Sequence, residues 1–402
     1  MDIQQGAPPM FGFVFHTPTK VVFGENAEDK AGLLAKEAGA RRILIHYGGQ
    51  SALKSGLIGR IRASLEKEGM ICTELGGVVP NPRLSKVREG LELALRENVD
   101  FILAVGGGSV IDSAKAIAYA AFEPEKDVWE LFARKRKASG CLPLGAVPTI
   151  AAAGSETSNS CVISNDATGE KRSYNDNISR PCFALMNPEL TMSLSPWQTA
   201  SGCADIMMHT MERYFTNGGN MELTDSIAEG LLRTVMRNAL ILKEQPHNYE
   251  ARAEIMWAGS LSHNGLTGCG TDGGDFASHM IEHELGGMFD VTHGAGLTAV
   301  WGSWARYVHM NCLHRFEKFA LRVMQVKPGK DAAETALKGI MALESFFRSI
   351  GLPVSMSGLG IFPTDDQIRQ MACSAAAGAG GGKGSAMFLK EDDIAAIYAM
   401  AR

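Results

Sequence analysis

A carboxylate and three histidines stand at spacings that suit a divalent metal ion. Asp205 and His209 are four residues apart, so on a helix their side chains share one face. His279 and His293 follow later in the same half of the chain. One carboxylate with neutral imidazoles is a donor set that binds Fe²⁺ or Zn²⁺. We therefore predict one divalent ion per chain at Asp205, His209, His279 and His293.

Such a metal site can be catalytic as well as structural. Four protein ligands leave a further position that a substrate oxygen can fill. His283 lies one helical turn after His279, which directs it toward the ion without requiring it to bind. Any single histidine is more often a packed structural residue than a ligand. We assign that structural role to His16, His46, His247, His263, His309 and His314.

Two glycine loops indicate a phosphate-bearing ligand. Gly106-Gly107-Gly108-Ser109 follows the predicted strand Phe101–Val105, and Tyr47-Gly48-Gly49-Gln50-Ser51 follows the strand that ends at His46. Backbone N–H groups and a helix N-terminus at such loops favour bound phosphate. Two loops suit an extended diphosphate better than one. The G-x-G-x-x-G fingerprint is absent, so a standard Rossmann motif is not indicated.

A third segment, 148–156, consists mostly of small residues. Its lack of bulk indicates that something packs closely against it. Either another stretch of backbone or a ligand satisfies that requirement, and the sequence does not decide between them.

The elements that must position these residues change in character along the chain. Short apolar strands alternate with helical stretches up to Asn187-Pro188, which predicts βαβ units and a mostly parallel sheet. From Pro196 onward the pattern is helical, and Gly286-Gly287 is expected to end the helix that His279 opens. The predicted fold class is α/β plus all-α. A Rossmann-like dinucleotide-binding domain (1–194) precedes an all-helical metal-binding and catalytic domain (195–402).

The predicted strands are Lys20–Phe23, Arg42–His46, Ile71–Leu75, Phe101–Val105 and Cys182–Met186. The predicted helices are Ala27–Ala38, Leu57–Glu68, Arg83–Glu97, Ile111–Ala121, Gln198–Phe215, Glu222–Leu242, Ala251–Gly265, Phe276–Leu285, Thr298–Met310, Asp331–Ile350 and Asp366–Ala376.

Composition excludes several classes of protein. The chain has 402 residues and 45% hydrophobic content, enough for more than one domain. A formal charge of −5 argues against nucleic acid and anionic membranes as partners. The opening Met1-Asp2-Ile3-Gln4 has no basic start, and no apolar run reaches the ~20 residues of a membrane helix. The eight cysteines show no closely spaced pair. We expect a cytoplasmic protein with reduced thiols.

Taken together, the motifs resemble the iron-containing (group III) alcohol dehydrogenases. The resemblance rests on Gly106-Gly107-Gly108-Ser109, Gly154-Ser155-Glu156, Gly202-x-x-Asp205-x-x-x-His209, and His279-x-x-x-His283 with His293-Gly294. It runs from end to end, and it includes Phe15–Gly24, Pro80-Asn81-Pro82, Asn187–Leu190 and Phe346–Pro353. Within the family, the chain looks most like the butanol dehydrogenase and long-chain aldehyde reductase branch.

The resemblance implies the same four metal ligands, with His283 near the nicotinamide or the substrate. It implies cofactor contacts at Gly107, Gly108, Ser109, Asp112, Thr149, Lys171 and Leu190. The predicted cofactor set also includes Gly48, Gly49, Gln50, Ser51, Asn81 and Ser158. Two departures from the family matter. Ala152-Ala153 stands where many members read Gly-Thr, so one hydroxyl facing the cofactor is missing, and Phe276 stands where close relatives often carry Trp.

The expected function is a metal-dependent NAD(P)H alcohol dehydrogenase or aldehyde reductase. It would interconvert small to medium aliphatic aldehydes and primary alcohols, with His283 relaying the proton. NADPH is expected over NADH because the Gly48-Gly49 loop carries no carboxylate to repel a 2′-phosphate. We also expect a homodimer.

Three alternatives remain open from the residues. A lyase similar to dehydroquinate synthase would use the same cofactors, but its anionic substrate requires pocket Arg and Lys residues, which are missing from 203–212 and 276–296. A metal-dependent hydrolase would share the ligands but has no use for two phosphate-binding loops. The third alternative is a non-catalytic metal-binding or nucleotide-binding protein.

Overall fold

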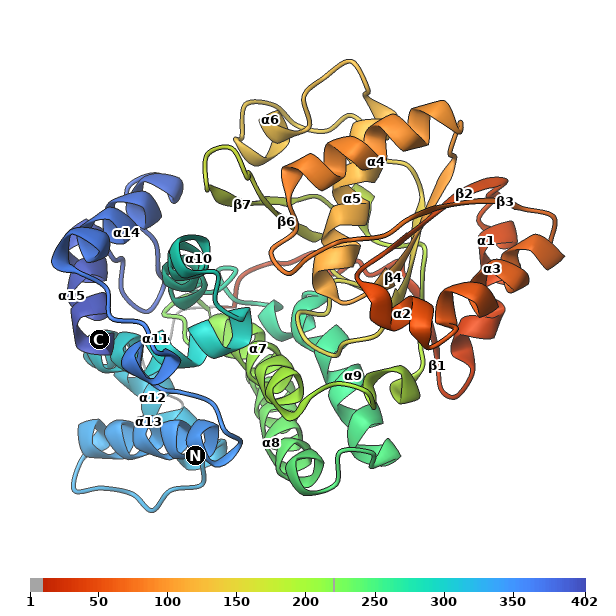
Figure 1. The fold of residues 1–402 in the computed structure, drawn as a ribbon. Coiled ribbons are helices and arrows are strands. Elements are labelled where there is room, and N and C mark those ends of the chain that lie inside the picture. The colour runs from red at the N-terminus through yellow and green to blue at the C-terminus, as the bar shows by residue number, and fades with distance from the viewer. Residues whose placement is uncertain (1–9, 220) are drawn as a thin grey trace. The chain divides into compact units, whose positions relative to one another are not determined.

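The computed structural model describes residues 10–219 and 221–402, which form two compact units (Figure 1). One unit is His16–Leu194, and the other is Ser195–Arg402 together with the described residues Met10–Phe15. The domain boundaries expected from the sequence, 1–194 and 195–402, stay a prediction. The described residues Met10–Phe15 group with the second unit, where the Phe11 N–H donates to the Gly270 carbonyl at 3.1 Å. The opening residues 1–4 lie outside the described residues.

The first unit is built on a six-stranded parallel sheet with strand order β1-β8-β5-β4-β2-β3. The strands are β1 (Lys20–Phe23), β2 (Arg42–Tyr47), β3 (Ile71–Leu75), β4 (Phe101–Gly106), β5 (Leu144–Pro148) and β8 (Phe183–Met186). This sheet confirms the predicted α/β class. Strand β5 was not predicted, because it contains Gly and Pro, which are poor strand formers. Burial between β4 and β8 stabilises it.

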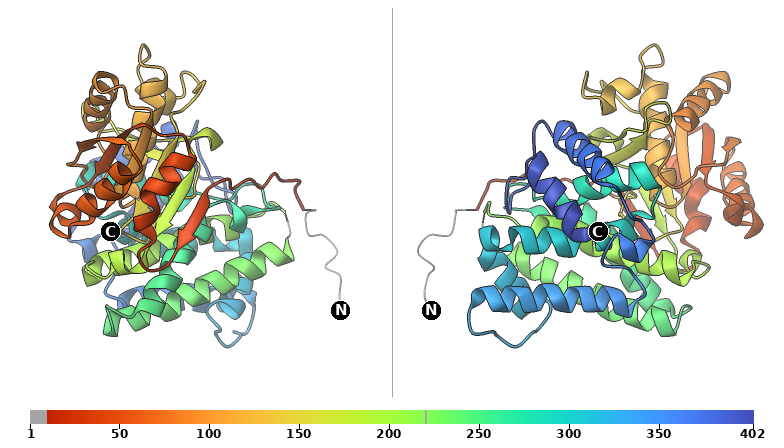
Figure 2. Two further views of the ribbon diagram at one scale, coloured as in Figure 1. Left: turned by 90° about the vertical axis from the view of Figure 1, so that its right-hand side faces the viewer. Right: turned by 60° about the vertical axis from the view of Figure 1, so that its left-hand side comes forward.

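Helices cover both faces of this sheet (Figure 2). Ile43 and Ile45 pack in one cluster with α1 and α3, whereas Leu44 packs in the opposite cluster with α4 and α5. Alternate residues of a strand point to opposite faces, so the apolar run of β2 serves both layers. The helical elements are η1 (Ala27–Lys30), α1 (Ala31–Glu37), α2 (Gln50–Lys54), α3 (Leu57–Lys67), α4 (Leu84–Arg96), α5 (Gly108–Phe122) and α6 (Trp129–Phe132).

An antiparallel hairpin of β6 (Ser160–Ser164) and β7 (Lys171–Asn175) lies outside the main sheet. It was not predicted, because neither strand has the apolar alternation of a half-buried strand. The short helices η2 (Asn177–Ser179) and η3 (Pro188–Thr191) flank β8.

The strand registers bring three loops to one edge of the sheet. Tyr47 pairs with Val105, and Gly106 pairs with Pro148, so β2, β4 and β5 all end at the same level. The chain leaves β2 toward β3 and leaves β4 toward β5, in opposite directions across the sheet. In open α/β sheets, ligands bind beyond the carboxyl ends of the strands at such a reversal of strand order.

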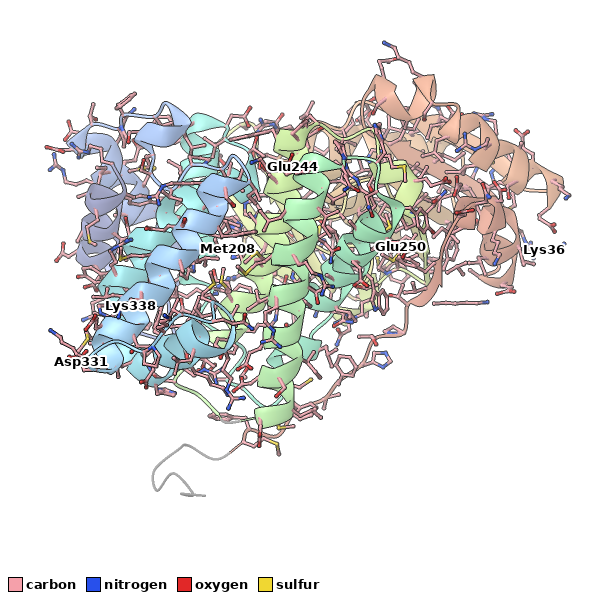
Figure 3. All side chains as sticks on the ribbon, turned by 90° about the horizontal axis from the view of Figure 1, so that it is seen from below. Lys36, Met208, Glu244, Glu250, Asp331 and Lys338 are labelled. Carbon is pink, nitrogen blue, oxygen red and sulfur yellow. The ribbon has the colours of Figure 1, made fainter. Side chains whose placement is uncertain are left out.

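The second unit is helical, as predicted (Figure 3). Figure 3 shows α8, with Glu244 near its end, beside α9, with Glu250 near its start. Its helices are α7 (Pro196–Tyr214), α8 (Glu222–Glu244), α9 (Tyr249–His263), η4 (Leu266–Gly268), α10 (Ala277–Phe289), α11 (His293–Val308), η5 (His309–Cys312), α12 (Leu313–Arg322), α13 (Ala332–Ser349), η6 (Ser357–Leu359), α14 (Asp365–Gly378) and α15 (Glu391–Ala401). Helices α12 and α15 were not predicted.

The prediction that Gly286-Gly287 ends a helix was wrong. Helix α10 continues to Phe289, and Asp290 ends it in the left-handed conformation (φ 51°). Glycine in a helix costs only about 1 kcal/mol relative to alanine, which tertiary packing readily offsets. The buried residues Leu285 and Gly286 indicate that packing. Among the residues that the structure describes, no helix combines the length and apolar character needed to cross a membrane.

Candidate metal and cofactor sites

Helix α7 begins with a capping box and carries two of the predicted ligands. The Ser195 side chain accepts from the Gln198 N–H, and Pro196 occupies the first helical turn. Asp205 and His209 then lie one turn apart on the buried face of the helix. Their ligand atoms and that of His279, in the first turn of α10, all lie within 4.8 Å of one another.

His293, the first residue of α11, joins this group. From Asp205 Oδ1 the distances are 3.0 Å to His209 Nδ1, 4.0 Å to His279 Nε2 and 3.7 Å to His293 Nε2. The structure therefore brings together the four residues that the sequence singled out. Gly294 allows the close approach of α11 to α7, because a Cβ there would lie 2.0 Å from the Ser201 carbonyl oxygen.

The Nδ1 atom of each of these histidines lies within hydrogen-bond distance of an oxygen atom. His209 Nδ1 lies 3.0 Å from the Asp205 carbonyl oxygen, and His279 Nδ1 lies 2.8 Å from Glu212 Oε1. His293 Nδ1 is in hydrogen-bond contact with Glu282 Oε2. Carbonyl and carboxylate oxygens only accept, so in a neutral ring the proton lies on Nδ1 and the lone pair on Nε2.

Two buried atoms of this group have no hydrogen-bond partner within the described ranges 10–219 and 221–402. They are Asp205 Oδ1 and His279 Nε2. An unpaired buried polar group costs about 1–3 kcal/mol, so such atoms mark a place where something else supplies the partner. A carboxylate oxygen and an imidazole nitrogen with a lone pair fit a divalent ion such as Fe²⁺ or Zn²⁺.

Electrostatics favour the protonation states that a metal requires. Burial and the charge of His209 lower the pKa of His279 to about 4, although Glu212 opposes the shift, so the imidazole is neutral at pH 7. Burial alone would raise the pKa of Asp205, but His209 and His293 hold it well below its ordinary value. A neutral ring and an ionised carboxylate are the ligand forms of these side chains.

His283 lies beside this group. Its ring centroid is 6.3 Å from that of His279 and 5.7 Å from that of His293. With Glu282 and His293 it forms a second set of possible ligand atoms within 4.8 Å of one another. His293 belongs to this second set and also lies 3.7 Å from Asp205 Oδ1 of the first. His283 therefore lies beside the predicted metal ligands, and its role there stays a prediction.

Phe276 shapes the approach to His279. It adopts the left-handed conformation (φ 55°) just before α10, and its ring centroid is 5.9 Å from that of His279. The Arg213 guanidinium lies 4.9 Å and the Lys383 ammonium 5.5 Å from the Phe276 ring centre. Both cations lie outside the ranges 203–212 and 276–296, in which the sequence showed no Arg or Lys.

Sequence reasoning also missed residues that contact the predicted ligands. Glu212 follows Asp205 by seven residues, and Glu282 follows His279 by three. Both spacings return to one helix face, so this signal was available. His263 of α9 was assigned a structural role, yet its ring centroid lies 4.0 Å from that of His209. Nothing in the sequence indicated that contact.

Several of the predicted cofactor residues lie at the carboxyl ends of β2, β4 and β5. Gly48 and Gly49 connect β2 to α2, and Gln50 and Ser51 are helical, so the loop is shorter than predicted. Gly107 caps α5, and a Cβ there would lie 2.8 Å from Ile150 Cδ1. The Gly107 backbone therefore packs closely against the Ile150 side chain, which belongs to the segment 148–156.

Thr149 follows β5, and its N–H donates to the Gly106 carbonyl at 3.1 Å. Gly108 and Ser109 open α5, where free N–H groups and the helix dipole favour a phosphate. Asn81 takes the left-handed conformation (φ 55°), Lys171 begins β7, and Leu190 lies in η3.

Asp112 and Ser158 make their hydrogen bonds inside the protein. Asp112 accepts from Ser155 Oγ at 2.6 Å and from the Val162 N–H at 3.0 Å. Ser158 is 0% exposed, and its hydroxyl accepts from the Ser160 N–H at 3.2 Å. These contacts indicate that both side chains shape the segment 155–162, and their contact with a cofactor stays a prediction.

Lys115 reinforces that segment from α5. Its buried ammonium donates to Ser155 O and Oγ at 2.8 and 2.9 Å, to Ser158 O at 3.0 Å and to Ser160 O at 2.8 Å. Burial lowers the pKa of Lys115, and nearby Asp112 opposes that shift.

Comparison with known proteins shows matches along both units. Residues 18–188 match the family model of iron-containing alcohol dehydrogenase, and residues 199–402 match the C-terminal model of the Fe-containing alcohol dehydrogenase family. NADH-dependent butanol dehydrogenase A of Clostridium acetobutylicum is 37% identical, covering 97% of this chain and 99% of that protein. NADPH-dependent aldehyde reductase YqhD of Escherichia coli is 36% identical, covering 88% and 90%.

A solved structure agrees with these matches. The crystal structure of NADH-dependent butanol dehydrogenase A from Thermotoga maritima superposes with a TM-score of 0.94 at 37% identity, covering 98% of this chain and 99% of that one. Both family models and these full-length relatives lead to one assignment. The chain belongs to the iron-containing alcohol dehydrogenase family.

Proposed function

We propose that this protein interconverts small to medium aliphatic aldehydes and primary alcohols, with NADPH as the preferred hydride donor. The observation that carries the proposal is that Asp205 Oδ1 lies 4.0 Å from His279 Nε2 and 3.7 Å from His293 Nε2, while Asp205 Oδ1 and His279 Nε2 are buried without a hydrogen-bond partner among the described residues. Family membership and the names of the similar butanol dehydrogenases and aldehyde reductase support the reaction class. They favour it over the lyase, hydrolase and binding-protein alternatives.

The proposed metal ligands are Asp205, His209, His279 and His293. These residues would hold a divalent ion, which would supply Lewis-acid chemistry toward a substrate oxygen. Asp205 supplies the one negative charge of the ligand set, and the neutral imidazoles add none, so the site keeps a net positive charge. That balance favours an oxygen that gains negative charge during the reaction.

His283 is the proposed proton carrier. It is half-buried beside His279 and His293, outside the group of Asp205, His209 and His279. An imidazole exchanges a proton near neutral pH, which suits both alcohol formation and alcohol oxidation.

The proposed cofactor contacts are the residues predicted from the sequence, of which Gly48, Gly49, Gly107, Gly108, Ser109 and Thr149 lie at the ends of β2, β4 and β5. A nicotinamide held there would supply the hydride chemistry. Backbone N–H groups at Gly107, Gly108 and Ser109 would hold its diphosphate, and Gly48, Gly49 and Ser51 lie at the neighbouring strand end.

The preference for NADPH rests on the loop after β2. Gly48-Gly49 carries no carboxylate, and the exposed Gln50, Ser51 and Lys54 of α2 supply donors and positive charge. The similar relatives include both NADH-dependent and NADPH-dependent enzymes, so the loop and not the family supports this choice.

The proposal is tested with the full chain loaded with Fe²⁺ or with Zn²⁺. Oxidation of NADPH and of NADH is followed with butanal, longer straight-chain aldehydes and an aldehyde that carries a carboxylate. We expect turnover of the neutral aliphatic aldehydes and a higher kcat/KM with NADPH. Absence of turnover with every aldehyde and both ions would contradict the reaction class. A higher kcat/KM with NADH would contradict the cofactor preference alone.

The homodimer and the cytoplasmic location expected from the sequence stay predictions. Light scattering coupled to size-exclusion chromatography measures the first. Fractionation of the source cells measures the second.

A further inference from the structure

Two carboxylates beside the proposed metal site are buried but are not among its ligands. Glu212 is 2% exposed and Glu282 is 0% exposed. An ionised carboxylate is costly to bury unless strong donors surround it, so their presence requires a physical explanation.

Glu212 joins α7 to the first turn of α10. Its Oε1 atom accepts three hydrogen bonds, from Ser278 Oγ at 2.6 Å, from the His279 N–H at 2.9 Å and from His279 Nδ1 at 2.8 Å. The last of these fixes how the His279 ring is rotated. Because Glu212 lies on the same face of α7 as Asp205 and His209, one helix carries two proposed ligands and the support of a third.

Glu282 joins α10 to α11 in the same way. It follows His279 by one helical turn, and its Oε2 atom contacts His293 Nδ1. His293 opens α11, so this contact fixes the ring at the very start of that helix. The two carboxylates thus connect α7, α10 and α11 through the rings of His279 and His293.

The support of His209 is of a different kind. Its Nδ1 atom lies 3.0 Å from both the backbone carbonyl oxygen and the Oδ1 atom of Asp205, which is itself a proposed ligand. His279 and His293 instead each have Nδ1 against a carboxylate outside the proposed ligand set. This difference allows the role of each carboxylate to be measured separately.

We propose that Glu212 and Glu282 are positioning residues that set the metal affinity of this site. Glu212 holds His279, and Glu282 holds His293, in the tautomer and rotation that direct Nε2 toward Asp205 Oδ1. Carboxylates that accept from a ligand histidine orient the ring and increase its basicity, and their loss weakens metal binding about 10- to 100-fold. The inference rests on the proposed metal site.

The test measures Co²⁺ binding to the full-length, metal-free protein. Affinity is obtained by competition with a chromophoric chelator, and the visible absorption of bound Co²⁺ reports the ligand geometry. Glu212→Gln and Glu282→Gln keep an accepting oxygen but remove the charge, whereas Glu212→Leu and Glu282→Leu remove both. The control is Glu244→Gln, because Glu244 is exposed at the end of α8.

We expect the control to bind as wild type does. The Leu variants should bind Co²⁺ about 10- to 100-fold more weakly with an altered absorption spectrum, and the Gln variants should lie between them and wild type. The unfolding midpoint of the metal-free protein is measured in parallel. A carboxylate with a merely structural role would lower that midpoint while leaving Co²⁺ affinity and spectrum unchanged.

The outcomes separate this inference from the proposed function. If wild type binds no Co²⁺, the metal site itself is wrong, and the inference falls with it. If wild type binds and all four variants bind with the same affinity and spectrum, the inference alone is overturned. Where a Leu variant does not fold, the Gln variant of the same residue decides, because it preserves the volume of the side chain.

Discussion

Asp205 Oδ1 and His279 Nε2 face each other at 4.0 Å, and each is buried without a hydrogen bond from any described residue. A direct hydrogen bond between them would need a separation of about 3 Å. The gap is too wide for that bond but suits two ligands of one ion, because metal–ligand distances of about 2.0–2.2 Å on each side span it. These two unpaired atoms therefore fit the proposed metal site.

The ligand assignment predicts loss of metal from histidine variants. His279→Ala and His293→Ala should each weaken metal binding by more than the roughly 10- to 100-fold expected for an outer residue, and activity should fall with it. Elemental analysis and NADPH oxidation measure the two effects. The control is His247→Ala, whose side chain is exposed. Full metal occupancy in both site variants would show that these residues are not ligands.

The role of His283 predicts a different pattern. His283→Ala should keep its metal while kcat falls by about 10²- to 10⁴-fold, because a positioned proton carrier contributes on that scale. Metal content and steady-state kinetics on the same preparation make the distinction. Loss of the ion would make His283 a ligand. Lower stability with an unchanged kcat would make it a packing residue.

Cofactor preference can be tested at Gly48. A Cβ there would lie 3.6 Å from Val110 Cγ2 and from the Val78 carbonyl oxygen, which is ordinary contact, so the backbone at Gly48 has room for a Cβ atom. Gly48→Asp should weaken NADPH binding more than NADH binding, and shift the ratio of kcat/KM values about tenfold or more through charge repulsion. Gly59→Asp is the control, because it adds the same charge to an exposed position of α3. An equal effect of both variants would remove the loop from the cofactor site.

A buried histidine in the α/β unit predicts a pH dependence of stability. Burial lowers the pKa of His46 to about 4, Lys86 lowers it further, and the bond to the Leu75 carbonyl opposes both. His46 is neutral when folded, so only the unfolded chain binds its proton between its ordinary pKa of 6.5 and about 4. The free energy of unfolding therefore does not depend on His46 above pH 6.5. As the pH falls from 6.5 to 4, protonation of His46 in the unfolded chain lowers that free energy by about 3 kcal/mol in all.

Urea denaturation across this pH range tests the prediction. His46→Asn keeps a donor for the Leu75 carbonyl but does not titrate, so its free energy of unfolding should fall less steeply than that of wild type as the pH is lowered. His247→Asn, at an exposed position, should follow wild type. Parallel curves for wild type and His46→Asn would contradict the pKa shift.

The sequence predicted what depends on local patterns. The parallel sheet followed from strands and helices in alternation, and its fold class is confirmed by the structure. Asp205 and His209 were paired by a spacing of one helical turn, and the structure brings His279 and His293 to them. Residue type and helical period are local properties, so they can be read without the fold.

Features that depend on tertiary packing were missed. Strand β5 is stabilised by burial between β4 and β8, and α10 continues through two glycines because its surroundings offset their poor propensity. The contact of Lys383 with Phe276 joins residues more than a hundred positions apart. No local spacing indicates such a contact, whereas Glu212 and Glu282 did lie at helical spacings that could have been recognised.

We propose that this protein needs a bound divalent ion to reduce an aldehyde. The most direct measurement compares NADPH oxidation by butanal in the metal-free protein, and in the same protein after Fe²⁺ or Zn²⁺ is restored to one ion per chain. We predict no turnover without the ion and recovery in proportion to its occupancy, with no recovery in His279→Ala. A metal-free protein that reduces butanal at the full rate would contradict the account.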